Sequence, residues 1–270
     1  MVADCISTSM MYSTIRICCE DSIGTGFFFL FNIGEKQYPI IITNQHVIKY
    51  NKDAEVSFCL NLMNEDGSDG GKYILNLNTF WVFHPSQDLC FTFANQIITE
   101  IERRSNKKVR LTYLSNDLIP SKETLESLMA IEEVVMVGYP NGLYDEAHNL
   151  PLFRHGYTST HPAYDFNNLG LGTVDMAVFP GSSGSPVLIL NEGSYSTGEG
   201  LVVGNRVLFL GVMVRGPIFS VEGTIREIEV PTATKTIVQS GVMMNLGYYI
   251  RAEHILDFEK MIIQYTAGVE

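Results

Sequence analysis

The chain has 270 residues, of which 46% are hydrophobic and 18% are charged, which is enough apolar content for the core of a globular protein. Its formal net charge of -12 argues against binding to nucleic acid or to anionic membrane surfaces, because phosphate binding depends on clusters of Lys and Arg. No apolar run reaches the roughly 18 residues of a membrane span, and no basic-then-apolar leader opens the sequence, so we expect a cytoplasmic protein.

Cysteine usage argues against a disulfide framework and against a metal centre. The cysteines are odd in number and lack Cys-x-x-Cys spacing, so we expect buried free thiols: Cys5, Cys18, Cys19, Cys59 and Cys90. The histidines have no metal-ligand spacing either, and we predict no metal and no cofactor. The one local basic run, residues 103–108, is interpreted as a solvated loop or strand end.

From Tyr12 onward, short apolar runs alternate with turns rich in Gly, Asn and Asp, which is typical of antiparallel strands in a sandwich or barrel. We predict strands over 14–19, 27–32, 39–43, 54–62 and 72–83, with the acidic, glycine-rich segment 64–71 as a hairpin connection. The strand that ends at Thr43 is apolar throughout, so it is buried on both faces and delivers His46 from a rigid place. The alternative is a histidine that merely satisfies a strand end.

Asp88 opens a strongly apolar strand, residues 88–93. A carboxylate at the head of a buried strand needs a partner, because an isolated buried charge is too costly. The Nδ1–H of His46 would satisfy it and would leave Nε2 free to accept a proton. Two alternatives stay open: Asp88 as the cap of a turn, and His84 as a rival partner, although we expect His84 to be exposed beside Pro85.

The pattern changes after Ser115. Leu125, Leu128 and Met129 have helical spacing behind a serine at position 121, which predicts a short linker helix over 121–131. Strands resume at 133–137, and a loop and strand region with surface histidines at 148, 155 and 161 follows. Residues 252–265 carry apolar positions three and four apart, which predicts an amphipathic C-terminal helix that docks on a barrel.

Residues 174–186 run from an apolar strand into a tight loop of glycines, serines and a proline. With Gly181 two residues before Ser183 and Gly184 one after it, the backbone can bend so that the N–H groups of Gly181 and Ser183 point beside the Ser183 oxygen. This arrangement is what a serine nucleophile with an oxyanion hole requires. The alternative is an ordinary Gly/Ser/Pro turn between two strands.

With His, Asp and Ser in that order, the chain resembles the trypsin-like serine peptidases of chymotrypsin fold, especially the short bacterial ones. Five segments carry the resemblance: residues 24–27, 43–47, 88–89, 138–140 and 175–186. Asp175 lies eight residues before Ser183, as in HtrA-like members. The resemblance implies an all-β fold of two six-stranded antiparallel barrels, with a barrel over 10–114, a linker with a short helix over 115–132, a second barrel over 133–250 and a C-terminal helix over 251–270.

The resemblance also implies the roles of the site residues. His46 is the general base and then acid, Asp88 orients it, Ser183 is the nucleophile, and the N–H groups of Gly181 and Ser183 form the oxyanion hole. A polypeptide substrate pairs with the edge strand 213–215. The pocket for the substrate residue before the cleaved bond (P1) is lined by four residues, namely Ala177, Met213, Val214 and Arg215.

The P1 preference follows from the pocket residues. Ala177 stands where a carboxylate would hold Lys or Arg, and Met213 stands where glutamyl-specific relatives carry a histidine. We therefore predict apolar P1 residues, with attraction of an acidic P1 residue by Arg215 or His161 as the alternative.

Other departures concern regulation and class. Ser182 replaces the aspartate that pairs with a new N-terminus in digestive members, so we expect no activation by N-terminal cleavage, and control by a partner protein, substrate binding or loop ordering. A latent or inactive protease-fold protein that binds peptides or a partner is the alternative function. An α/β-hydrolase esterase is excluded, because Ser185 stands where Gly-x-Ser-x-Gly requires glycine and the order is His, Asp, Ser.

Overall fold

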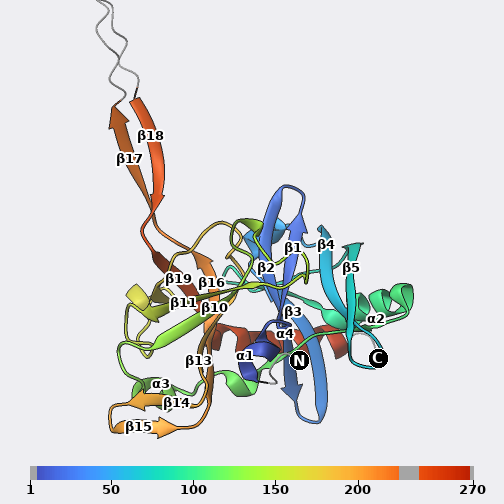
Figure 1. The fold of residues 1–270 in the computed structure, drawn as a ribbon, viewed down its shortest axis with the longest axis horizontal. Coiled ribbons are helices and arrows are strands. Elements are labelled where there is room, and N and C mark those ends of the chain that lie inside the picture. The colour runs from blue at the N-terminus through green and yellow to red at the C-terminus, as the bar shows by residue number, and fades with distance from the viewer. Residues whose placement is uncertain (1–4, 225–236, 268–270) are drawn as a thin grey trace, which may run out of the picture.

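Strands outnumber helices in the computed structural model, which describes residues 5–224 and 237–267 (Figure 1). Residues 225–236 of the segment predicted as the second barrel, and residues 268–270 of the predicted C-terminal helix, lie outside this description. The two halves of the chain form separate sheets that share one apolar core.

The N-terminal half forms a nine-stranded sheet in the order β5-β4-β1-β2-β3-β7-β6, with β8 beside β4 and β9 beside β2. The predicted hairpin connection is confirmed, since β4 and β5 pair across it. The bounds are β1 (Thr14–Cys19), β2 (Ser22–Ile33), β3 (Lys36–Thr43), β4 (Glu55–Met63), β5 (Asp69–Asn78), β6 (Val82–Phe83), β7 (Cys90–Phe93), β8 (Lys108–Val109) and β9 (Leu114–Ser115).

The prediction of a closed six-stranded barrel is wrong for this half, because within the described residues β5 and β6, at the two ends of the sheet, do not pair. A helix that the sequence analysis did not predict, α2 (Ala94–Ser105), packs against the sheet instead and buries Ile97 and Ile101 completely in its core. The basic run interpreted as a loop or strand end includes the last turn of α2. There Arg103 and Arg104 bind Glu100, and positive charge suits the C-terminal end of a helix.

The C-terminal half confirms the barrel prediction, since six strands close in the order β10-β11-β12-β19-β16-β13. The bounds are β10 (Glu133–Gly138), β11 (Leu152–Thr158), β12 (Leu171–Asp175), β13 (Pro186–Asn191), β16 (Arg206–Arg215) and β19 (Leu246–Arg251). Two ribbons were not predicted: β14 (Ser194–Thr197) with β15 (Gly200–Val203), and β17 (Ile218–Thr224) with β18 (Ile237–Met243). The second ribbon projects away from the two sheets (Figure 1).

The predicted linker helix is α3 (Lys122–Ser127), whose cap is the Ser121 hydroxyl that accepts the Thr124 N–H at 3.2 Å. It ends before the predicted boundary because Leu128 is already extended. The C-terminal helix is present as a 3₁₀ turn, η5 (Ala252–Asp257), and α4 (Phe258–Ala267). The other short helices are α1 (Ile6–Met10), η1 (Gln45–Ile48), η2 (Asn116–Leu118), η3 (Pro140–Gly142) and η4 (Phe166–Asn168).

One apolar core joins the two halves. Phe27 and Phe29 from the N-terminal sheet meet Phe209 from the barrel, with ring centroids 5.4 and 6.0 Å away. The C-terminal helix packs onto the N-terminal sheet, where Phe258 lies 4.8 Å from Phe91. The cysteines are free thiols, as expected, but the expected burial holds only for Cys19, Cys59 and Cys90, since Cys5 and Cys18 are half-buried. Over residues 5–224 and 237–267, no helix has both the length and the apolarity to cross a membrane.

Candidate active site

The structure brings His46 and Asp88 together. His46 lies in η1 directly after the buried strand β3, and Asp88 lies just before β7, which pairs with β3. The His46 Nδ1 is 2.5 Å from one carboxylate oxygen, Oδ2, and the other oxygen, Oδ1, accepts the His46 backbone N–H at 3.1 Å. A carboxylate is only an acceptor, so Nδ1 carries the proton and Nε2 is the ring nitrogen left to accept one.

The residues before His46 hold the turn that presents Asp88, a role the sequence analysis missed. The Asn44 side-chain amide donates to the Asp88 carbonyl at 2.7 Å. The Gln45 amide lies within 2.9–3.0 Å of the carbonyls of His84, Gln87 and Leu89. The segment that carries the imidazole therefore also grips the loop that carries the carboxylate, and amide side chains next to a strand-end histidine were the signal available in the sequence.

The expectation of an exposed His84 is wrong. His84 is only 4% exposed, because its ring lies between the turn and the C-terminal segment, where Asp257 and Phe258 contact it. It is not the partner of Asp88, whose two oxygens are both used by His46.

The loop around Ser183 is held by backbone hydrogen bonds to both halves of the chain. The Thr25 N–H donates to the Ser183 carbonyl at 2.9 Å, and the Gly184 N–H donates to the Met213 carbonyl at 2.8 Å. Gly184 has φ +84°, and an added Cβ would lie 1.9 Å from the Thr25 oxygen. Only glycine fits so close an approach in this conformation.

Two N–H groups of this loop are unpaired. In the described part of the chain, no group accepts a hydrogen bond from the N–H of Gly181 or of Ser183. The Pro180 carbonyl accepts the Asn141 N–H at 2.5 Å, and the C=O and N–H of one trans peptide point in opposite directions, so the Gly181 N–H points away from Asn141. Free donors next to a serine hydroxyl are the components of an oxyanion hole.

The Ser183 hydroxyl itself is not joined to His46. It donates to the Val214 carbonyl at 3.1 Å, and in the described residues it has no hydrogen bond to the imidazole. The two loops are nevertheless connected, because the Thr43 hydroxyl donates to the Thr25 carbonyl at 2.7 Å and Thr25 binds the Ser183 loop. The His–Asp pair and the serine loop are thus formed but not joined by a hydrogen bond, and the serine hydroxyl binds a carbonyl of β16 instead.

The predicted pocket residues differ in exposure. Met213 is fully buried in the barrel core with Val178, whereas Ala177 and Val214 are half-buried and Arg215 is exposed. His161 is half-buried, and its Nδ1 accepts the N–H of Ala163. Of the four predicted pocket residues, three are thus apolar and one is an exposed cation.

Another thiol lies near the site. Burial raises the pKa of Cys90 well above its usual value of 9.0, and the negative charge of Asp88 adds to the effect. A thiol that stays protonated is a poor nucleophile. Cys90 is therefore not a rival to Ser183.

One group of side chains, His84, His254 and Asp257, has ligand atoms within 4.8 Å of one another. A metal-bound histidine normally donates its other ring N–H. The His84 Nδ1 instead accepts the N–H groups of Ser86 and Gln87, at 3.2 and 2.9 Å, so its proton lies on Nε2, which faces Asp257. The hydrogen bonds of His84 do not fit a metal ligand.

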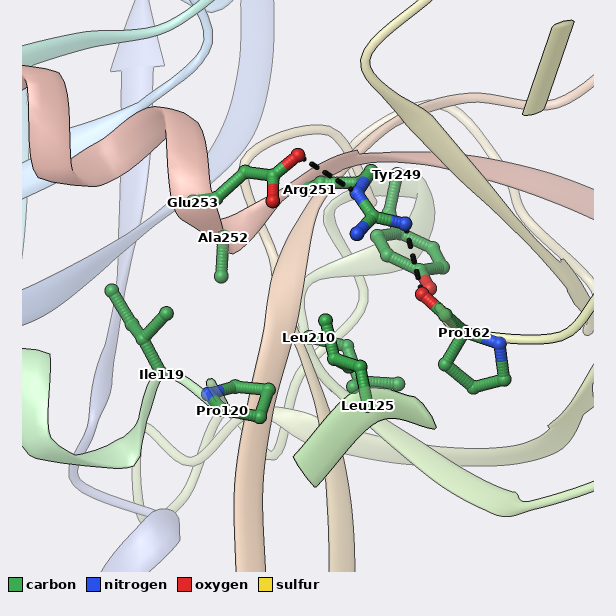
Figure 2. Close-up of a pocket in the computed structure, with 9 residues that line it drawn as sticks. All are labelled: Ile119, Pro120, Leu125, Pro162, Leu210, Tyr249, Arg251, Ala252 and Glu253. Carbon is green, nitrogen blue, oxygen red and sulfur yellow. Dashed lines mark hydrogen bonds and ion pairs between the residues drawn. The ribbon is translucent and has the colours of Figure 1, made fainter. Parts of the chain in front are cut away.

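A small cavity lies apart from the site, between the linker and the end of β19 (Figure 2). The Arg251 side chain at its wall donates to Glu253 and to the Pro162 carbonyl. Its volume of about 20 Å³ suits a single water molecule. This cavity is too small for a peptide or a cofactor.

Comparison with known proteins gives one family. A model of the trypsin-like peptidase domain matches residues 24–196. A search of curated proteins found no match.

Many solved structures are similar to the chain, and three of them illustrate the low identity. The inactive form of the Rv3671c protease is 15% identical and covers 94% of this chain and 91% of that chain, with a TM-score of 0.45. A serine-to-alanine mutant of Rv3671c from M. tuberculosis H37Rv, also in its inactive form, is 14% identical, with coverage of 93% and 86% and a TM-score of 0.45. The scabies mite inactivated protease paralogue S-I1 is 12% identical, with coverage of 95% and 96% and a TM-score of 0.49.

Proposed function

Because the chain belongs to the family of trypsin-like peptidase domains, which covers residues 24–196, we propose that it is a serine endopeptidase that cleaves peptide bonds through an acyl-enzyme. The observation that carries the proposal is the His46–Asp88 pair, in which both carboxylate oxygens are used on one histidine. The two unpaired N–H groups beside Ser183 support it further. In this proposal the two sheets correspond to the two halves of the chymotrypsin fold.

The proposed mechanism gives each group one task. Ser183 Oγ attacks the carbonyl carbon of the substrate while His46 Nε2 takes the hydroxyl proton, and Asp88 stabilises the imidazolium through the Nδ1–H. The N–H groups of Gly181 and Ser183 donate to the oxyanion. His46 then gives its proton to the leaving amine, and a water molecule repeats the steps to release the acid. Before attack, the Ser183 hydroxyl must leave the Val214 carbonyl and donate to His46 instead.

The substrate of this proposal is a polypeptide that pairs with the end of β16 at residues 213–215. Ala177 and Val214, the two half-buried residues of the predicted pocket, are apolar, so the P1 residue is apolar. Cleavage of a peptide library after acidic residues, which Arg215 would attract, would contradict this preference. Digestion of a library with mass-spectrometric mapping of the cut sites measures it directly.

The compartment in this proposal is a reducing one, namely the cytoplasm. The support is that all five cysteines are free thiols, whereas disulfides persist in oxidising compartments. Cell fractionation followed by immunodetection tests the location.

A second candidate, a latent or inactive protein that binds peptides or a partner, is favoured by one observation: the Ser183 hydroxyl binds the Val214 carbonyl and not His46. In this alternative the hydroxyl stays on β16 unless a partner protein reorders the loop. The two candidates differ in whether the free protein has a reactive serine.

Labelling with a fluorophosphonate separates them, because this reagent reacts only with an activated serine. The proposed enzyme is labelled at Ser183, and Ser183→Ala abolishes the label. Ser185→Ala is the matched control, because its hydroxyl lies in the same loop, is buried and has no hydrogen-bond partner in the described structure. A folded wild-type protein that takes up no label contradicts the constitutive enzyme, and recovery of labelling with a partner protein identifies the latent form.

A further inference from the structure

The turn from His84 to Asp88 decides where the Asp88 carboxylate points. Its backbone closes on itself, since the His84 N–H donates to the Leu89 carbonyl and the Leu89 N–H donates to the Gln87 carbonyl, both at 2.8 Å. The carboxylate must reach both the ring and the backbone of His46. A shift of this turn would therefore change the orientation of the imidazole.

The His84 side chain folds back into its own turn. Its Nδ1 accepts the N–H groups of Ser86 and Gln87, the two residues directly before Asp88. The carbonyls of the same turn accept hydrogen bonds from the side-chain amides of Asn44 and Gln45. The donors and the acceptors of the turn thus have separate partners, and His84 supplies the acceptor.

The C-terminal segment fixes the His84 ring. Because Nδ1 accepts, the proton is on Nε2, which lies 3.2 Å from a carboxylate oxygen of Asp257. The ring also packs edge-on against Phe258 at 5.7 Å and His254 at 6.1 Å. Asp257 is largely exposed, whereas the His84 side chain is almost completely buried, so His84 is the more rigid partner of the two.

We propose that His84 is a positioning residue for the reaction: it fixes the turn that carries Asp88, and Asp257 of the C-terminal segment holds its tautomer. The inference rests on the proposed function, because it acts through the His46–Asp88 pair. If His84 only stabilised the fold, its substitution would lower the melting temperature and leave the kcat of the folded protein unchanged. If His84 is a positioning residue, its substitution lowers kcat in protein that is still folded.

Four variants test this in the full-length protein. His84→Leu removes both ring nitrogens, whereas His84→Asn keeps an acceptor oxygen at the place of Nδ1. Asp257→Ala removes only the partner of Nε2. His155→Asn is the matched control, because His155 is an exposed histidine whose Nδ1 lies 3.3 Å from Glu133 on the barrel.

The kinetic readout is kcat and KM for a peptide substrate taken from the library. A misplacement of about 1 Å costs about 10²-fold in rate, so we expect His84→Leu to lower kcat by about that factor with little change in KM. His84→Asn should recover most of the loss, Asp257→Ala should lose less than His84→Leu, and His155→Asn should match the wild type. Circular dichroism and thermal unfolding identify variants that fail to fold.

The second readout does not need turnover: the downfield proton resonance of the His46 Nδ1–H, which reports its short bond to Asp88. We expect it in the wild type and in His84→Asn, and we expect it to shift or broaden in His84→Leu. Wild-type activity in folded His84→Leu, an equal loss in His84→Asn and His84→Leu, or an unchanged resonance in His84→Leu would each overturn the inference. An inactive, unlabelled wild type would defeat the proposed enzyme instead, and the resonance would still decide the role of His84.

Discussion

Asp88→Asn is the substitution whose effect the geometry defines best. The two carboxylate oxygens have different tasks, since Oδ1 accepts the His46 backbone N–H at 3.1 Å and Oδ2 faces the His46 Nδ1 at 2.5 Å. An asparagine keeps one oxygen, and the backbone N–H requires that oxygen at the Oδ1 place. The amide NH₂ then faces Nδ1 and donates to it, which moves the ring proton to Nε2.

A histidine protonated at Nε2 cannot take the Ser183 proton. For the same wrong-tautomer change in the general serine-protease template, kcat falls about 10⁴-fold, which corresponds to about 5 kcal/mol of transition-state free energy. We expect a loss of this size in Asp88→Asn, with KM nearly unchanged because the substrate does not contact Asp88. Steady-state kinetics with a peptide substrate and the rate of fluorophosphonate labelling measure it.

Asp145→Asn is the matched control. Asp145 repeats the geometry on an exposed loop, where one oxygen lies 2.8 Å from the His148 Nδ1 and the other accepts the His148 backbone N–H at 3.2 Å. The Asp145–His148 pair is not part of the proposed catalytic site, so Asp145→Asn should leave kcat unchanged. A loss of less than tenfold in folded Asp88→Asn, or an equal loss in both variants, would refute the tautomer argument.

Two further predictions concern stability. Gly184→Ala should lower the free energy of unfolding by more than about 2 kcal/mol, because φ is +84° and the new Cβ would lie 1.9 Å from a backbone oxygen. Gly198→Ala is the control, since a Cβ there would have no atom within 4 Å. Equal melting temperatures for the two variants in thermal unfolding would contradict this prediction. Hydrogen bonds from Arg103 and then Arg104 lower the pKa of Glu100 from 4.5 to about 2. A carboxylate with a depressed pKa stabilises the fold above pH 4.5, and this stabilisation is lost as the pH falls towards 2. The difference in melting temperature between the wild type and Glu100→Gln should therefore decrease from pH 4.5 to pH 2. An unchanged difference at pH 2 would contradict this prediction.

The His46–Asp88 pair could be predicted because each residue adjoins a buried strand. A strand that is apolar on both faces has a central place in a sheet, and β3 and β7 are such strands and are neighbours. A carboxylate at the head of one and an imidazole after the other then have few partners except each other. The closed barrel of the C-terminal half was predicted from the resemblance to the trypsin-like peptidases, because strands separated by turns indicate either a sandwich or a barrel.

The open N-terminal sheet could not be predicted from strand patterns. Ile97 and Ile101 are four residues apart, which fits a helix, but α2 begins directly after β7, so no turn in the sequence separates the strand from the helix. The burial of His84 could not be predicted for another reason: its neighbour Pro85 marks a turn, and turns are usually exposed. Its burial comes from Asp257 and Phe258, which are far away in the sequence.

The place of the Ser183 hydroxyl was beyond sequence reasoning, because serine rotamers differ little in energy and the partner is a backbone carbonyl. That carbonyl, of Val214, belongs to the end of β16, where the proposed substrate pairs. A carbonyl oxygen has two lone pairs, so a substrate backbone N–H and the Ser183 hydroxyl can share this acceptor. Under the proposed function, the hydroxyl leaves the shared carbonyl for His46 when the substrate binds, so that binding and assembly of the nucleophile are one event. Under the alternative of a binding protein, the hydroxyl stays on the Val214 carbonyl beside the bound peptide.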